Sequence, residues 1–207
     1  MFSKAAPAVL LLFGAACAAD RPVVPQHQAN APAALTSGLG GVGSDVLADL
    51  AQVRQLASTY HDLGAAMAAG YTVWSPDPFV ANATCPSSAE GNMGYHLVNV
   101  PLRGGAANPA AGDAVIDPMH PEMLLYEKRA DGAVHLVGVE YIVFKAAWER
   151  VHGVGAAPPT VFGQPLLFSL HTFPGNPDPI PHYELHVWVF TSNPLGMFYP
   201  WNPTVTC

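Results

Sequence analysis

The stretch IPHYELHVWVF, residues 180–190, places His182, Glu184 and His186 at alternate positions among Val, Leu, Trp and Phe. In a β-strand alternate side chains point to the same face of the sheet, so these three titratable groups share a face. Pro181 and the β-branched and aromatic residues that follow favour a strand over a helix. A strand with the apolar composition of a buried core strand therefore carries two imidazoles and a carboxylate on one face, and the fold must account for them.

Two known metal motifs are excluded by the spacing in this stretch. The zinc-peptidase helix has the pattern His-Glu-x-x-His, in which Glu follows the first His directly, whereas Tyr183 follows His182 here. Cupins, which are small metal-binding β-barrels, carry His-x-His with a Glu a few residues later. The order in this chain is His-x-Glu-x-His, so the cupin motif is also absent.

Further strands are predicted on either side of this stretch. Short runs rich in Val, Tyr, Phe and Trp are separated by Pro, Gly and Asn, which is typical of strands bounded by turns. The predicted strands are residues 71–74, 93–100, 122–128, 133–144, 166–173 and 183–191. Because no helical segments alternate with them, we expect an antiparallel sheet that forms a barrel-like or sandwich-like domain.

Three more of these strands carry a titratable group on an otherwise apolar face. These groups are His96, Glu127 and Glu140. Strand alternation places Glu140 on the same face as Leu136 and Ile142, where a carboxylate must be paired, protonated or bound to a metal. If these faces turn inward together, their titratable groups converge.

Imidazole and carboxylate ligands together suit Zn, Fe, Mn, Ni or Cu, and two His with one carboxylate form a known iron site. Residues two apart on a strand are separated by about 6.7 Å and residues four apart by about 13 Å, so not all three groups of the stretch can share one ion easily. The first-choice ligand set is therefore His96, Glu184, His186 and one of His182 or Glu140. We expect a mononuclear site within the sheet domain.

A hydrogen-bonded network without a metal is the alternative. Glu140 could be satisfied by Tyr hydroxyls, by backbone amides, or by Arg103 or Arg150. His171 could belong to the core or to the site. The metal hypothesis predicts a metal-binding protein whose ion could activate water or dioxygen. The alternative predicts a non-catalytic module that binds a small-molecule ligand or an envelope partner and has a structural polar interior.

The N-terminus has the pattern of an export signal over residues 1–18. Residues 2–4 include one Lys, and a short apolar run with small residues follows, too short to span a bilayer. Cleavage after Ala18 would release a soluble protein, whereas cleavage before Cys17 would leave a lipidated cysteine as the only membrane anchor. We expect a periplasmic, cell-surface or extracellular protein.

Residues 19–43 are rich in Pro, Gly, Ala and Gln and are predicted to be a flexible linker. Apolar residues then recur at three- and four-residue steps, which predicts one long amphipathic helix over residues 45–69 that ends at Gly70. The fold class is thus α+β. A long N-terminal helix packs on the β-rich segment, residues 71–207, within a single globular domain of residues 44–207.

Cysteine usage predicts one disulfide bond. Cys17 is either cleaved away or acylated, which leaves Cys85 and Cys207 as a pair. In an oxidising compartment an even pair of cysteines is expected to bond.

The overall composition sets limits on function. Half of the 207 residues are apolar and 11% are charged, which is the composition of a globular domain rather than of a disordered chain. The formal net charge of -7 provides no basic surface for nucleic acid.

Several stretches together resemble one group of proteins. GNMGYHLVN, DPMHPEMLLYE, LVGVEYIVF, HYELHVWVF and NPLGMFYPWNPTVTC lie within residues 91–207. With the helix end YHDLGAAMAAGY, they are similar to an uncharacterised family of exported bacterial β-rich proteins. The resemblance implies an exported single domain and implies no activity.

Overall fold

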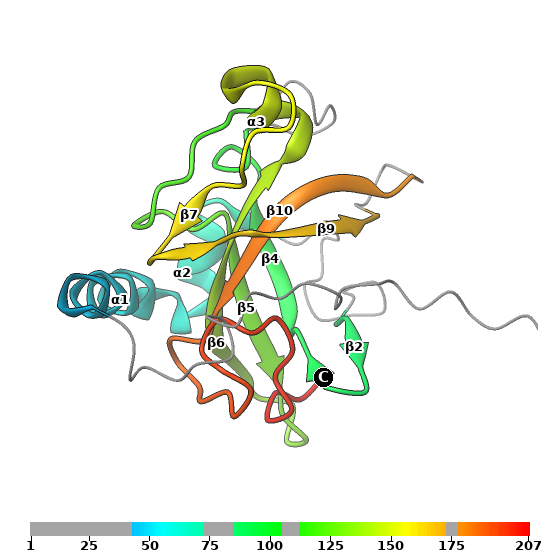
Figure 1. Cartoon of the computed structure of the whole chain (residues 1–207). Coiled ribbons are helices and arrows are strands. Elements are labelled where there is room, and N and C mark those ends of the chain that lie inside the picture. Colours follow the sequence, from blue (N-terminus) through cyan, green and yellow to red (C-terminus); the bar gives the residue numbers. More distant parts are fainter. Residues whose placement is uncertain (1–42, 73–84, 105–111, 173–177) are drawn as a thin grey trace, which may run out of the picture.

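The computed structural model describes residues 43–72, 85–104, 112–172 and 178–207 (Figure 1). The predicted signal peptide and all but the last residue of the predicted linker lie outside the described residues. Among the described residues, every helix is too short or too polar to cross a bilayer.

A six-stranded antiparallel sheet forms the centre of the fold, in the order β1-β4-β5-β6-β10-β9. Its strands are β1 (Tyr71–Thr72), β4 (Tyr95–Asn99), β5 (Met123–Lys128), β6 (Val134–Phe144), β9 (Leu167–His171) and β10 (Ile180–Val187). Each of the six predicted strands has its counterpart here, and the α+β class is confirmed. The sheet ends at β1 and β9, so the described strands form an open sheet and not the closed barrel that was one of the two expected forms.

Two small hairpins accompany the sheet and were missed in the sequence. The first pairs β2 (Ser87–Ser88) with β3 (Gly91–Asn92), and the second pairs β7 (Thr160–Val161) with β8 (Gln164–Pro165). The second hairpin turns at Phe162 and Gly163, which both have positive φ, the backbone conformation that a two-residue hairpin turn requires.

The predicted long helix is broken into three parts. They are α1 (Ser44–Ala57), a 3₁₀ turn (Ser58–His61) and α2 (Leu63–Ala68). The break falls at Asp62, whose extended backbone begins a new helix and whose side chain accepts hydrogen bonds from the amides of Gly64 and Ala65. Asp is a preferred N-cap residue, so the signal was present in the sequence. The prediction that the helix ends at Gly70 is confirmed by its positive φ of 94°.

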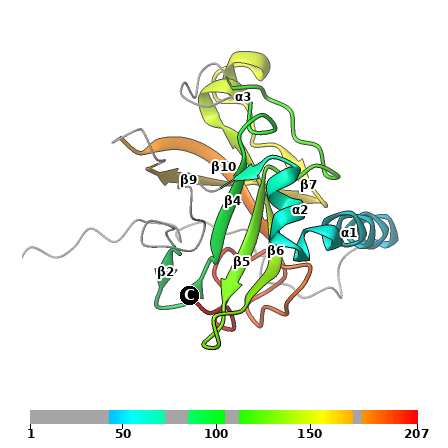
Figure 2. The ribbon, with the colours of Figure 1, turned by 180° about the vertical axis from the view of Figure 1, so that it is seen from behind.

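One face of the sheet packs against α1 and α2 and forms the main core (Figure 2). The odd-numbered residues of β10, and those of β6 from Val139 onward, point to this face, because side chains alternate along a strand. The core includes Val139, Tyr141, Val143, Tyr183, Leu185 and Val187 from the sheet, with Leu50, Val53 and Ala57 from α1. The even-numbered residues, which carry the predicted ligands, therefore point to the opposite face.

That opposite face, called here the titratable face, is apolar at both ends. At one end Phe144 and Ile180 pack with Ala147 of α3 (Lys145–His152). At the other end Leu125, Val137, Trp188 and Val205 pack together beneath the C-terminal tail. The titratable side chains lie on the same face of β6 and β10, at positions between these two apolar clusters.

A register shift corrects one prediction about this face. Tyr126 pairs with Leu136 but Leu125 pairs with Gly138, so Val137 is an extra residue in β6. Leu136 consequently packs in the main core and does not share a face with Glu140.

The predicted disulfide Cys85–Cys207 is confirmed, with the two Cα atoms 6.0 Å apart. The tail that it anchors also pairs with β3, where Asn92 and Asn202 exchange two backbone hydrogen bonds. The Trp188 indole donates to the carbonyl of Tyr199 in the same tail. These contacts hold the C-terminus over one end of the titratable face.

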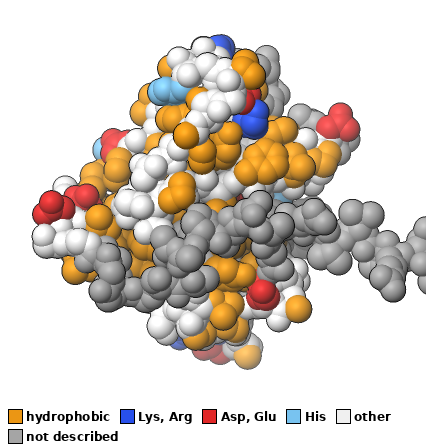
Figure 3. All heavy atoms as spheres, in the orientation of Figure 1, with side chains coloured by type: hydrophobic (Ala, Val, Ile, Leu, Met, Phe, Trp, Pro, Cys, Tyr) orange, Lys and Arg blue, Asp and Glu red, His pale blue; other side chains and the backbone are white. Residues whose placement is uncertain are grey.

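Hydrophobic side chains are also visible at the surface near the edge strand β9 (Figure 3). Phe168 and Leu170 are 53% and 47% exposed, while Ser169 between them is buried. Their register partners are Tyr183 and Pro181, so the two exposed residues lie on the side of β9 that faces away from the titratable groups.

Candidate metal centre

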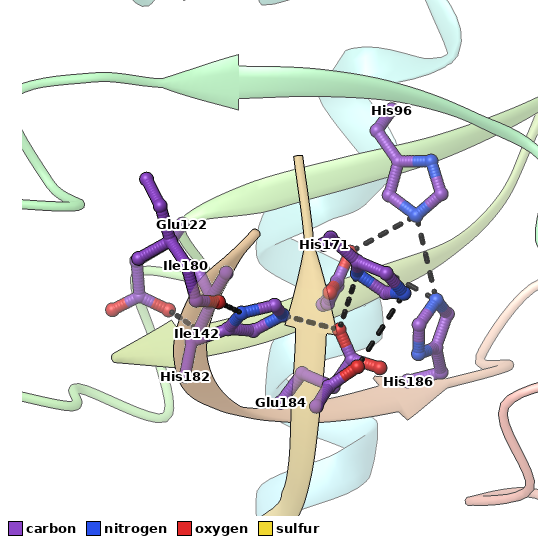
Figure 4. A network of polar contacts seen from close by, with 10 residues as sticks. His96, Glu122, Ile142, His171, Ile180, His182, Glu184 and His186 are labelled. Atoms are coloured by element: carbon purple, nitrogen blue, oxygen red, sulfur yellow. Dashed lines mark hydrogen bonds and ion pairs between the residues drawn. The ribbon is translucent and has the colours of Figure 1, made fainter. Parts of the chain in front are cut away.

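Six titratable side chains from four strands gather on the titratable face (Figure 4). They form two groups of three. The first group, called here triad A, contains His96 of β4, Glu140 of β6 and His186 of β10. The second group, triad B, contains His171 of β9 with His182 and Glu184 of β10.

Strand register determines the members of triad A. His186 and Glu140 are direct partners in the β6–β10 ladder, so their side chains project side by side. His96 lies on β4, and β5 separates it from β6, so the imidazole reaches across β5 to the carboxylate.

The three ligand atoms of triad A form a compact triangle. The Nε2 atom of His96 lies 3.1 Å from Oε2 of Glu140 and 3.4 Å from Nε2 of His186. The third edge, from His186 Nε2 to Glu140 Oε2, is 3.9 Å. A point inside a triangle with edges of 3.1, 3.4 and 3.9 Å lies about 2.0 Å from all three atoms, which is the length of Zn–N and Zn–O bonds.

The backbone orients the His96 ring toward this point. Burial lowers the pKa of His96, whereas the Glu140 carboxylate and, to a smaller extent, a hydrogen bond with the backbone of Gly94 raise it. A backbone hydrogen bond that raises the pKa of a histidine is one that the ring donates to a carbonyl, so the other ring N–H is held by Gly94. An imidazole held by a backbone carbonyl on one nitrogen presents the lone pair of the other, as metal-ligating histidines do. Gly94 has a φ of 85°, and a Cβ there would lie 2.9 Å from the carbonyl oxygen of Tyr126.

Triad B repeats this arrangement on the outer strands. His182 Nε2 lies 3.0 Å from Oε2 of Glu184, and His171 Nδ1 lies 3.4 Å from the same oxygen. The His182 Nδ1 atom is 2.7 Å from the Ile180 carbonyl, to which it donates. In both triads, then, one carboxylate oxygen faces two imidazole nitrogens, and one of the two rings is fixed by a backbone carbonyl.

Burial and charge act against each other in both triads. Burial by itself raises the pKa of the Glu140 and Glu184 carboxyls, but the neighbouring histidines outweigh it and hold both pKa values below the usual range. Burial lowers the pKa of His96 and His182, and the facing carboxylates outweigh it and raise both. Each triad therefore favours a positive charge on its nitrogen side, which a proton or a metal ion can supply.

The triads are buried but reachable from one side each. Glu140, His182, Glu184 and His186 are at most 3% exposed. The side chains of His96 and His171 are 19% and 30% exposed. These two histidines are thus the members of each triad nearest to solvent.

All five predicted ligands lie on the titratable face, but the structure divides them between the two triads. Glu140 joins His96 and His186, whereas Glu184 joins His182. The first-choice set placed Glu184 with His186, its neighbour on the same strand. Direct register across β6 and β10 brings Glu140 nearer to His186, so the pairing across strands decides the partner.

His171 is the site residue that the sequence left undecided between core and site. Its register partner on β10 is Ile180, four residues from Glu184, but its ring lies beside that of His182, with centroids 5.1 Å apart. From there its Nδ1 atom lies 3.4 Å from the Glu184 carboxylate. Glu127, the other carboxylate that the sequence placed on an apolar strand face, belongs to neither triad. It forms an ion pair with Arg129 and accepts a hydrogen bond from the amide of Thr206 in the tail.

The arginines that could have satisfied Glu140 are engaged with other groups. Arg150 donates to the carbonyl of Gly112, and the Arg103 guanidinium lies over the ring of Phe144, 5.3 Å from its centroid. The Tyr141 hydroxyl, on the other face of β6, donates to the carbonyl of Pro118. Glu140 faces His96 and His186 instead.

Comparisons with known proteins assign the chain to no family. No family model matches the chain, and neither a curated protein nor a solved structure matches it. The resemblance to exported bacterial proteins therefore stays a prediction.

Proposed function

We propose that this chain is an exported metal-binding protein that holds a divalent transition-metal ion in triad A. The observation that carries the proposal is the triangle of His96, Glu140 and His186, because one point inside it lies at metal-bond length from all three ligand atoms. A hydrogen-bonded network explains the triangle less well, since only its 3.1 Å edge has the length of a good hydrogen bond.

The ligand chemistry indicates the class of ion. Two imidazoles and one carboxylate suit Zn and also Fe(II), Mn, Ni or Cu. Three protein ligands leave at least one coordination position for water, and a metal-bound water loses its proton at a much lower pH than free water. The exposed edge of His96 is the side from which water or a small-molecule ligand would approach.

Export is supported by two independent features. The disulfide Cys85–Cys207 is compatible with an oxidising compartment, where such bonds persist. Residues 1–18 have the composition of a signal peptide. We propose a periplasmic, cell-surface or extracellular location on these grounds.

The competing function is a non-catalytic module with a structural polar interior. The edges of 3.0 and 3.1 Å between His182 and Glu184 and between His96 and Glu140 favour it, because they are also hydrogen-bond lengths. In that case protonated histidines would neutralise the carboxylates, and the protein would bind no transition metal.

Metal analysis of the purified, disulfide-bonded chain separates the two functions. After dialysis against Zn²⁺ and then against metal-free buffer, we expect the native chain to retain bound zinc. We expect the His96→Ala variant to lose the zinc of triad A. The matched control is His120→Ala, since His120 forms a surface pair with Asp117 at 2.7 Å and belongs to neither triad. Absence of Zn, Fe, Mn, Ni and Cu after reconstitution would refute the metal proposal and favour the structural interior.

A further inference from the structure

We propose that triad B holds a second divalent transition-metal ion, so that the titratable face carries a two-ion centre. The inference rests on the proposed function of triad A and extends it to His171, His182 and Glu184. Triad B has the same composition as triad A, with two imidazoles and one carboxylate whose ligand atoms all lie within 4.8 Å of one another.

The orientation of His182 calls for a cation in triad B. Its Nδ1 donates to the Ile180 carbonyl at 2.7 Å, so the neutral ring carries its lone pair on Nε2. That lone pair faces the Glu184 carboxylate at 3.0 Å. Two acceptors at this distance need a positive charge between them, which is either a proton on His182 or a metal ion.

The position of His171 favours the metal ion. A proton on His182 accounts for the contact between His182 and Glu184 alone, whereas one metal ion accounts for the contacts of both histidines with Glu184. His171 directs Nδ1 to the same Oε2 atom of Glu184, at 3.4 Å. In triad B the carboxylate oxygen lies 3.0 and 3.4 Å from the two nitrogens, and in triad A the corresponding distances are 3.1 and 3.9 Å. Such separations are those of ligands around a shared ion with bonds of about 2.0–2.2 Å.

The two triads lie next to each other on β10. Glu184 of triad B and His186 of triad A are two residues apart on the same face, which is about 6.7 Å along a strand. The charge of Glu184 acts on both His96 and Glu140, and that of His186 acts on Glu184. An ion in one triad therefore changes the electrostatic environment of the other, as in a two-ion centre.

The test uses the partly exposed histidine of each triad, because removal of a fully buried partner leaves an uncompensated charge in the interior and is more destabilising. Zinc per chain is measured by elemental analysis after equilibrium dialysis of the full, disulfide-bonded chain. We expect two ions in the native chain and in the control His120→Ala. We expect one ion in His96→Ala and one in His171→Ala.

A second variant protects the test against a folding defect. Glu184→Gln keeps the size of the side chain and removes its charge, so we expect one ion and an unchanged near-ultraviolet circular dichroism spectrum. Copper(II) provides an independent measurement. The native chain should show magnetic coupling between two ions by electron paramagnetic resonance, and His171→Ala should show one isolated ion.

The outcomes separate this inference from the proposed function. One ion in the native chain and in His171→Ala, with none in His96→Ala, would overturn the second ion and leave the function of triad A intact. A single ion that disappears in both variants would mean that the triads share it, which also overturns the two-ion centre. No ion in any of these proteins would refute both proposals.

Discussion

The two faces of the sheet are built from the same strands and both bury side chains at their centres, yet they differ in what they bury. On the helix-covered face, Tyr141, Val143 and Leu185 belong to one continuous apolar core. On the titratable face, the neighbouring residues Glu140 and Glu184 are as inaccessible to water, and histidines surround them.

The difference indicates a division of tasks between the faces. Apolar burial stabilises the fold by about 25 cal/mol for each Å² removed from water, and the helix-covered face supplies most of it. Buried ionisable groups usually contribute little to stability and are costly to leave unpaired. The proposed metal binding would give a reason for six such groups at the centre of a sheet face, and the following predictions test this division.

The largest expected effect concerns the disulfide that holds the C-terminal tail over one end of the titratable face. Replacement of both Cys85 and Cys207 by Ser removes a link between residues 122 positions apart, which contributes about 4–5 kcal/mol in the chain-entropy treatment. Urea unfolding of the variant and the native chain measures the loss. A loss below about 1 kcal/mol would mean that the other contacts of the tail, such as Trp188 to Tyr199, are sufficient to hold it.

The next effect distinguishes the faces directly. Leu185→Ala on the helix-covered face should cost about 2–5 kcal/mol because it leaves a cavity in the main core, yet zinc stoichiometry should not change. Thermal unfolding and elemental analysis check the two parts. Phe168→Ala, on the exposed side of β9, is the control and should change stability by less than about 1 kcal/mol. Loss of zinc in folded Leu185→Ala would show that the faces are not independent.

Zinc itself should stabilise the protein through the titratable face. At a free concentration one hundred times the Kd, one ion adds about 2.7 kcal/mol to the free energy of unfolding, and His96→Ala should reduce the total gain. Protons compete for the same nitrogens, and the pKa values of His96 and His182 are raised, so the gain should grow as pH rises from 6 to 8. Scanning calorimetry with and without zinc measures it. A gain that is equal at all pH values would contradict histidine ligation.

The smallest expected effect tests a buried carboxyl outside the triads. Burial raises the pKa of Glu122 well above its ordinary value, although the Ile142 amide donates to it. As pH rises above about 4.5, the unfolded state releases this proton before the folded state does, so stability falls. Glu122→Gln should therefore raise the Tm at pH 7 by about 2–4 °C, which is about 1 kcal/mol for a chain of this size. The difference in Tm between the Glu122→Gln variant and the native chain should vanish near pH 4. A difference in Tm that is the same at both pH values would mean that packing, and not the charge, causes the gain in stability.

Much of the fold was accessible from the sequence because its signals are local. Alternation over residues 180–190 identified β10 and the face of His182, Glu184 and His186. The cysteine pair predicted the disulfide. The break at Asp62 was also local, and it was missed because the helical period of the apolar residues continues across it.

The division of the ligands into two triads was not accessible in the same way. Nothing in the order of residues states that Glu140 is opposite His186, or that the His171 ring lies within 3.4 Å of the Glu184 carboxylate. The extra residue at Val137 likewise removed Leu136 from the face that simple alternation assigned to it.

The sequence by itself determined which side chains point to which face, because the direction of a side chain depends on its own strand and repeats every second residue. The tertiary structure alone decided which of these side chains meet. Contacts between strands depend on register and strand order, which are set by turns, a bulge and packing of the whole sheet. In this protein the folded sheet brings the five predicted ligands and His171 together as two triads.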